Sequence, residues 1–104
     1  MALELSQAEQ GDHCIVMAKG EIDLYSSPQL REAILKACKA GKSKVGVNLS
    51  EVAYMDSSGV ATLVEGLQAS GGGDSFLLVA PSQSVLKVLQ LSRLDSVFTI
   101  VEQV

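Results

Sequence analysis

The chain has 104 residues, of which 47% are apolar and 19% charged, and its formal net charge is -4. This is the length of one small domain, which buries roughly 60–70% of the surface that its unfolded chain exposes. Twelve acidic residues against eight basic ones argue against a nucleic-acid-binding surface. No apolar run approaches the ~18 residues of a membrane-spanning helix, and residues 1–4 lack the features of a signal peptide. We therefore expect one soluble, cytoplasmic domain over residues 1–104 that binds neither nucleic acid nor membrane.

The first half of the chain alternates between strand and helix patterns. Residues 3–6 alternate apolar with polar side chains, and a Gly-Asp turn separates them from an apolar strand over 13–19, which predicts an antiparallel hairpin. After a predicted loop over 20–25, residues 26–28 (Ser-Ser-Pro) are typical of a helix start, with a hydroxyl cap and proline at the first helical position. Gly41 is the predicted C-terminal cap of this helix. Its apolar positions recur at helical spacing: Leu30, Ala33, Ile34, Ala37 and Cys38.

The second half predicts three further strands and two further helices. Residues 44–49 alternate as a strand, and a helical pattern begins at the polar run 56–59. Residues 75–80 form a continuous apolar strand, as expected inside a sheet. A third helix follows from residue 81, and 97–101 is the last strand. The order β-β-α-β-α-β-α-β predicts an α/β fold, a mixed β-sheet with helices packed against it.

No motif in the sequence indicates catalysis or metal binding. Gly41-Lys42-Ser43 looks like the end of a phosphate-binding loop, but Lys36 stands where that motif needs glycine. The one histidine, His13, lies far from any nucleophile motif. Cys14 and Cys38 have no second ligand at metal-binding spacing, so we expect two buried free thiols. The sequence thus predicts no metal, no cofactor and no enzymatic activity.

The polar run Asp56-Ser57-Ser58-Gly59 is the most informative segment. At a strand-to-helix turn, Asp and Ser side chains ordinarily accept hydrogen bonds from the free N–H groups of the first helical turn. A cap needs only one such residue, however, and functional sites of α/β sheets lie at turns of this kind. A phosphate on a serine here would face the positive end of the helix dipole. These residues alone leave two interpretations open, ordinary capping and a regulatory serine.

The segment from Asn48 to Gly59 resembles the signature of bacterial anti-sigma factor antagonists, which are single-domain members of the STAS family. Gly20-Glu21-Ile22-Asp23 matches a second landmark of that family, and residues 92–98 are similar to a third. The resemblance implies that Ser57 is phosphorylated by an anti-sigma factor that is also a serine kinase of the histidine-kinase-like ATPase fold. It further implies that the unphosphorylated protein binds this kinase and frees a sigma factor, and that a metal-dependent Ser/Thr phosphatase removes the phosphate.

The same match implies that Asp23 and Asp56 flank the modified serine and that Ser58 and Gly59 shape the docking surface. Tyr25, an aromatic residue in a polar loop, either belongs to that surface or packs on the neighbouring helix. We therefore expect partner binding at Asp23, Tyr25, Asp56, Ser57, Ser58 and Gly59. Family members often carry a final helix, which we do not expect here because the sequence ends soon after its last strand. The alternative function is that of a STAS scaffold subunit in a transporter or lipid-transport complex, which needs no phosphoserine.

Overall fold

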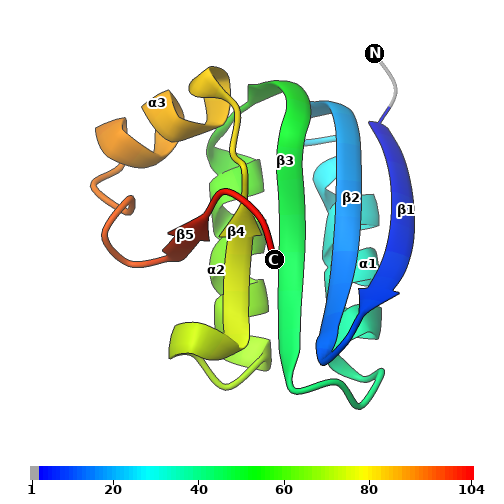
Figure 1. Ribbon diagram of the computed structural model, residues 1–104. Helices are drawn as coiled ribbons and strands as arrows, with labels where there is room; N and C mark the ends of the chain where they lie inside the picture. Colours follow the sequence, from blue (N-terminus) through cyan, green and yellow to red (C-terminus); the bar gives the residue numbers. More distant parts are fainter. Residues whose placement is uncertain (1–2) are drawn as a thin grey trace.

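Within residues 3–104, which the computed structural model describes, the chain forms five strands and three α-helices (Figure 1). The strands are β1 (Leu3–Gln10), β2 (His13–Ile22), β3 (Lys44–Met55), β4 (Phe76–Val79) and β5 (Thr99–Val101). The helices are α1 (Ser27–Cys38), α2 (Ser57–Ala69) and α3 (Gln83–Leu91), and a short 3-10 turn, η1 (Gly73–Ser75), precedes β4. Met1 and Ala2, part of the segment expected to lack signal-peptide features, lie outside the described residues.

The sheet has the strand order β1-β2-β3-β4-β5, so strands that follow one another in the sequence are neighbours in space. β1 and β2 form the predicted antiparallel hairpin, whose turn contains Gly11 at a φ of 57°. The other pairs are parallel, and each parallel connection contains one helix. The mixed α/β sheet expected from the order of the elements is therefore confirmed.

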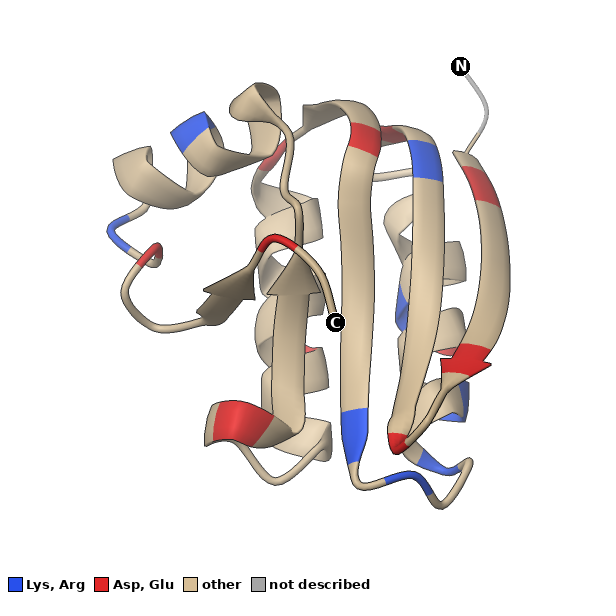
Figure 2. Cartoon of the chain, in the orientation of Figure 1, with Lys and Arg blue, Asp and Glu red and all other residues tan. Residues whose placement is uncertain are grey.

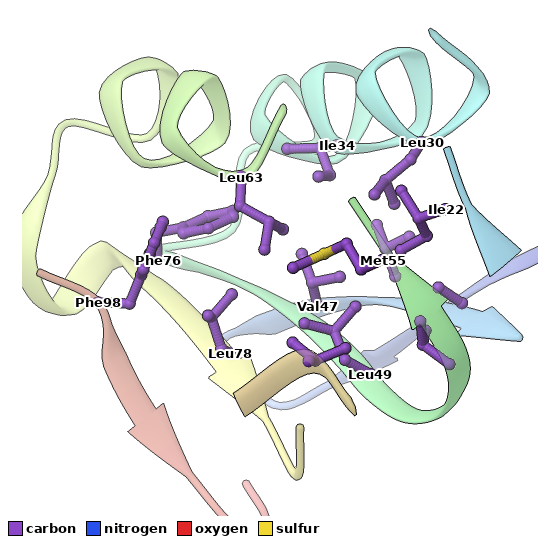
Figure 3. Packing of buried hydrophobic residues seen from close by; sticks show 14 of the residues in the cluster. Ile22, Leu30, Ile34, Val47, Leu49, Met55, Leu63, Phe76, Leu78 and Phe98 are labelled. Carbon is purple, nitrogen blue, oxygen red and sulfur yellow. The ribbon is translucent and has the colours of Figure 1, made fainter. Parts of the chain in front are cut away.

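The core lies between one face of the sheet and the helices α1 and α2, which lie side by side behind the sheet in Figure 1, and Val85 and Leu89 of α3 also belong to it. The core side chains alternate along the strands, since every second residue of β2, of β4 and of β3 as far as Leu49 faces these helices. Burial of each large apolar side chain contributes about 1.5–3 kcal/mol. Figure 3 labels the central residues: Ile22, Leu30, Ile34, Val47, Leu49, Met55, Leu63, Phe76, Leu78 and Phe98.

The boundaries of all five strands differ from the sequence prediction, and β1 runs on to Gln10 while β4 is one residue shorter at each end than predicted. β2 continues through residues 20–22, predicted as a loop, because irregular register next to Lys19 and Gly20 lets the strand keep its pairing with β3. β3 likewise runs beyond the predicted strand as far as Met55. The last strand begins at Thr99, because Val97 belongs to the turn before it. Pairing between distant segments extends β2 and β3 beyond what their local patterns indicate.

The ends of α1 also differ from the prediction. Ser26 precedes the helix, but its side chain makes no capping hydrogen bond to it, so the predicted hydroxyl cap is wrong. Pro28 is the second helical residue instead of the first. The helix ends at the C-cap Lys39, and Gly41, at a φ of 84°, follows two residues later. The longest helix of the described chain, α2, has 13 residues, and no helix there combines the length and hydrophobicity that a bilayer crossing requires.

Candidate functional site

The carboxyl ends of β2 and β3 bring two acidic residues to one edge of the sheet. Ile22 pairs with Met55 in the parallel register, and the amide N–H of Asp56 donates to the carbonyl oxygen of Ile22 at 3.1 Å. Asp23 and Asp56 therefore leave the sheet next to each other, as expected at strand ends of an α/β sheet. We call this region the carboxyl-end surface and define it by six residues: Asp23, Leu24, Tyr25, Asp56, Ser57 and Ser58.

Asp56 is the N-cap of α2. Its Oδ1 accepts a hydrogen bond from the backbone N–H of Ser58 at 2.9 Å and a second one from the Ser58 hydroxyl. Its carbonyl oxygen accepts from the N–H groups of Gly59 and Val60. The carboxylate also carries negative charge at the positive end of the helix dipole, which stabilises the helix. Capping therefore explains Asp56 and Ser58.

Ser57 is the first residue of α2, and capping does not account for it. Its side chain is exposed, and within residues 3–104 its hydroxyl makes no hydrogen bond. The side chains of the two adjacent residues, Asp56 and Ser58, are hydrogen-bonded to each other. An exposed, unpartnered hydroxyl at the start of a helix is accessible to an enzyme that modifies it, and a phosphate there would lie at the positive end of the helix dipole.

Gly59 lies beneath this surface. It is buried, and a Cβ atom at this position would come within 2.4 Å of Met55 Cγ and 2.8 Å of Ile22 Cγ2. Only glycine lets the first turn of α2 approach the strand ends this closely. Gly59 thus sets the position of the two serines from inside the protein.

The loop after β2 is held by reciprocal hydrogen bonds between Asp23 and Ser26. Asp23 Oδ1 accepts from the N–H groups of Tyr25 and Ser26, both at 2.9 Å, while Ser26 Oγ accepts from the N–H of Asp23 at 2.9 Å. The Ser26 hydroxyl also donates to the carbonyl oxygen of Glu21 at 2.8 Å, so the hydrogen bonds of this hydroxyl are made to residues before it and its Oγ accepts from Asp23 instead of from α1. The hydrogen bond from the Ser26 amide holds the pKa of Asp23 below its ordinary value.

Two large side chains project from this loop. Tyr25 is 86% exposed and Leu24 is 68% exposed, so the interpretation that Tyr25 packs on the neighbouring helix is wrong. Leu24 lies in the loop over residues 23–25, on which the sequence predicts that docking is centred, and an apolar residue in a polar loop is itself a signal. The sequence analysis did not single out Tyr54, which is 50% exposed near the end of β3 and pairs with Glu21. Exposed apolar groups that lie close together are typical of protein-binding surfaces.

Acidic residues gather at this end of the sheet. Figure 2 shows red segments where β2 and β3 end, with one blue segment among them. The basic residue is Lys19, which pairs with Glu51 across the two strands. The acidic residues in these segments and their following loops are Glu21, Asp23, Glu51 and Asp56. A further negative charge on Ser57 would therefore be added to an already acidic region.

The described residues offer no metal site. Nowhere in residues 3–104 do three His, Cys, Asp or Glu side chains group in a way that could hold a metal ion. Cys14 is buried and Cys38 is half-buried, and both are free thiols. Burial raises the pKa of both thiols, which disfavours the nucleophilic thiolate form.

Comparison with known proteins assigns the family. The family model described as "Mlab, STAS domain" matches residues 5–102. An anti-sigma-B factor antagonist of Staphylococcus epidermidis is 34% identical over 79 residues, which are 76% of this chain and 73% of that protein.

Solved structures of similar fold carry related descriptions. An anti-sigma factor antagonist from Mycobacterium paratuberculosis superposes with a TM-score of 0.89 at 22% identity, covering 99% of this chain and 88% of the other. The anti-sigma factor antagonist SpoIIAA in its unphosphorylated form gives 0.74 at 26% identity, covering 95% and 87%. The phosphorylated form of SpoIIAA, a Bacillus cell fate determinant, gives 0.66 at 25% identity, covering 95% and 90%. The chain belongs to the STAS domain family and, within it, to the anti-sigma factor antagonists.

Proposed function

We propose that this protein regulates transcription by partner switching and that phosphorylation of Ser57 is the switch. The unphosphorylated form binds an anti-sigma factor that is a serine kinase of the histidine-kinase-like ATPase fold, and this binding releases the sigma factor. The kinase phosphorylates Ser57, and a metal-dependent Ser/Thr phosphatase restores the binding form. The observation that carries the proposal is the exposed, unpartnered hydroxyl of Ser57 beside a cap formed by Asp56. The existence of SpoIIAA structures in both phosphorylation states supports it.

The expected mechanism is electrostatic. A phosphate adds a charge of about -1.5 to -2 at neutral pH, and the N-terminus of α2 stabilises it locally. The partner would then meet a hydrated dianion among carboxylates such as Asp23 and Asp56, so desolvation and like-charge repulsion both oppose docking. A loss of ~3 kcal/mol weakens binding more than a hundredfold, which is sufficient for a switch.

Docking is expected to centre on the carboxyl-end surface, with Tyr25 and Leu24 as apolar anchors. Exposed aromatic residues often dominate binding energy at the centre of an interface, where truncation costs ~2 kcal/mol or more. Asp23 holds the loop that carries both side chains, since its carboxylate accepts from the Tyr25 amide. The protein acts here as a binding partner and is a substrate of the kinase without being an enzyme itself.

The modification is tested by incubating the protein with its cognate kinase and ATP and mapping the product by peptide mass spectrometry. One phosphoryl group is expected at Ser57, and none in Ser57→Ala. Ser58→Ala is the matched control and should still be modified, because the Ser58 hydroxyl donates to Asp56. A phosphate on Ser58, or an unmodified protein in the presence of an active cognate kinase, would contradict the proposal.

The binding surface is tested by measuring kinase affinity calorimetrically. Ser57→Ala should bind the kinase with the affinity of the unphosphorylated parent protein, and Ser57→Asp should bind it more weakly. Tyr25→Ala should bind about thirtyfold more weakly than the parent if truncation costs ~2 kcal/mol. Leu91→Ala is the control, because Leu91 is equally exposed but lies at the end of α3. Equal kinase affinity of Tyr25→Ala and Leu91→Ala would show that Tyr25 is not part of the interface.

A scaffold role in a transporter or lipid-transport complex is the competing function. Such a subunit would bind a transporter ATPase and would not respond to a charge on Ser57. Copurification from the native host, with Ser57→Asp beside the unmodified protein, separates the two functions. Recovery of a kinase that Ser57→Asp fails to retain supports regulation, and recovery of a transporter ATPase by both forms supports the scaffold.

A further inference from the structure

Strand β1 presents a long free edge. It has eight residues, it pairs only with β2 in the described chain, and its register with β2 runs without a bulge from Leu3 to Gln10. The opposite edge of the sheet is formed by β5, which has three residues. Unpaired strand edges are templates for another strand, and proteins usually protect them with proline, a bulge, charged side chains or a covering segment, of which β1 carries only the charges of Glu4 and Glu9. β1 contains neither proline nor a bulge.

A groove runs between this edge and α1. Its volume is about 430 Å³, and its apolar floor is formed by two half-buried side chains, Leu5 of β1 and Ala33 of α1. An edge strand with a helix alongside is the arrangement in which domains accept an additional strand by β-augmentation. The full lining is Leu5, Ser6, Gln7, Gln29, Glu32, Ala33 and Lys36.

We propose that the occupant of this edge is the β1 strand of a second copy of the chain, paired antiparallel about a two-fold axis at Ser6. In this register Leu5 lies opposite the second copy's Gln7. Both residues belong to the face of the sheet that α1 covers, so this face continues from one copy into the other. Glu4 lies opposite Ala8, and Glu9 lies opposite Leu3. No like charges face each other across the strands, which favours this self-pairing.

The charges on α1 are complementary under the same symmetry. Because β1 runs antiparallel to its copy, the two α1 helices also run antiparallel, on the same face of the joined sheet. Glu32 and Lys36 both line the groove and are exposed, and neither forms an ion pair within residues 3–104. Across the two-fold axis, Glu32 of each copy faces Lys36 of the other copy, which gives two equivalent ion pairs.

The dimer leaves the carboxyl-end surface free. The two sheets join through β1, at the edge where Figure 1 places this strand, while Ser57 follows β3. Since the second copy's strands run in the opposite direction, the two Ser57 hydroxyls face opposite ends of the joined sheet. Each copy can therefore bind a partner independently, and the dimer does not depend on the proposed regulatory function.

The contacts between the two α1 helices are tested by exchanging the charges of Glu32 and Lys36. Dimerisation is measured by sedimentation velocity over a range of protein concentrations. The unmodified protein should form a concentration-dependent dimer. Glu32→Lys or Lys36→Glu alone should weaken dimerisation about tenfold or more, because each brings like charges together across the axis. The double exchange Glu32→Lys with Lys36→Glu should restore it. A monomer at every concentration, or a dimer that the single changes leave intact, would overturn the proposal.

A second variant tests the strand edge itself. Ser6→Lys places two lysines opposite each other on the axis and should abolish the dimer while the monomer stays folded, since Ser6 is exposed. Ser84→Lys introduces the same charge at an exposed position of α3 and should leave the dimer unchanged. Thermal unfolding followed by circular dichroism checks the fold of both. Dimerisation of Ser6→Lys equal to that of Ser84→Lys would exclude β1 as the interface.

Discussion

Gly59 allows the start of α2 to lie directly on the strand ends, and a methyl group has no room there. Alanine favours helix by about 1 kcal/mol over glycine, so propensity alone predicts that Gly59→Ala stabilises the protein. The new Cβ would lie 2.4 Å from Met55 Cγ, however. Overpacking of this kind costs about 1–3 kcal/mol, so we expect net destabilisation.

Urea denaturation of Gly59→Ala measures this effect. Ala61→Gly is the matched control, since Ala61 is exposed on the same helix and should lose only the propensity difference of about 1 kcal/mol. Met55→Ala combined with Gly59→Ala should show a favourable coupling energy, because removing the Met55 side chain relieves the closest contact. If Gly59→Ala is as stable as the unmodified protein, the packing of the first turn is looser than described.

Asp23 gives the loop a pH dependence whose sign follows from its lowered pKa. Hydrogen bonds from the amides of Ser26 and Tyr25 favour the ionised carboxylate in the folded state. Its contribution to stability is therefore complete above the unfolded pKa of about 3.9 and is lost as the pH falls through the lower, folded pKa.

Asp23→Asn should consequently lower the free energy of unfolding at pH 7, and this difference from the unmodified protein should shrink as the solution is acidified to about pH 3. Urea denaturation across that range measures it. Asp95→Asn removes an exposed carboxylate that makes no hydrogen bond in the described chain, and it controls for net charge. A difference that stays constant with pH would show that the carboxylate does not stabilise the loop through its charge.

At the scale of elements, Ser82 connects α3 to the central strand. Its hydroxyl accepts from the N–H of Val85 at 3.3 Å, which confirms the predicted helix start, and it donates to the carbonyl oxygen of Val52 at 2.7 Å. Ser82→Ala removes the cap and leaves the Val52 carbonyl without this donor, so a loss of about 1–2 kcal/mol is expected in thermal or urea unfolding. Ser84→Ala, at an exposed position of α3, should stay within about 0.5 kcal/mol of the unmodified protein.

In this chain, local sequence patterns predict correctly which helices and strands form, but they predict less well the residues at which each one begins and ends. The alternating apolar residues of β3 and the apolar face of α1 give clear sequence signals, because both sets of side chains form the core. Gly20 and Glu21 are typical of a loop, yet pairing with β3 keeps them in β2. The hydroxyl of Ser26 is engaged by Glu21 and Asp23, which precede it, and no sequence pattern distinguishes that arrangement from a helix cap.

At the scale of the whole molecule, the family resemblance and the physical signals single out the same segment. The run from Asp56 to Gly59 predicts the helix start, and the structure shows that Asp56 caps it through Ser58, while the regulatory role of Ser57 stays a proposal. The groove beside β1 depends on how β1 and α1 pack. It cannot be predicted from local sequence patterns, because the residues that line it come from two distant segments and are neighbours only in space.

Phosphorylation of Ser57 should leave the fold of the whole molecule unchanged. The added charge lies at the N-terminus of α2, where the helix dipole stabilises it, and within residues 3–104 the Ser57 hydroxyl makes no hydrogen bond whose loss would disturb the fold. Ser57 is exposed and is not part of the hydrophobic core cluster, which contains Val47 and Leu78. We therefore expect a local perturbation only.

Amide spectra recorded before and after modification by the kinase measure that perturbation. Chemical-shift changes should be confined to the loop at Asp23 and the first turn of α2, while β1 and η1 serve as internal controls, since β1 forms the far edge of the sheet and η1 follows the opposite end of α2. Ser57→Asp should reproduce the pattern with smaller changes, since one carboxylate carries less charge than a phosphate. Shifts spread across the sheet would show that phosphorylation selects a second conformation, and weaker partner binding would then reflect a change in populations instead of direct repulsion at the surface.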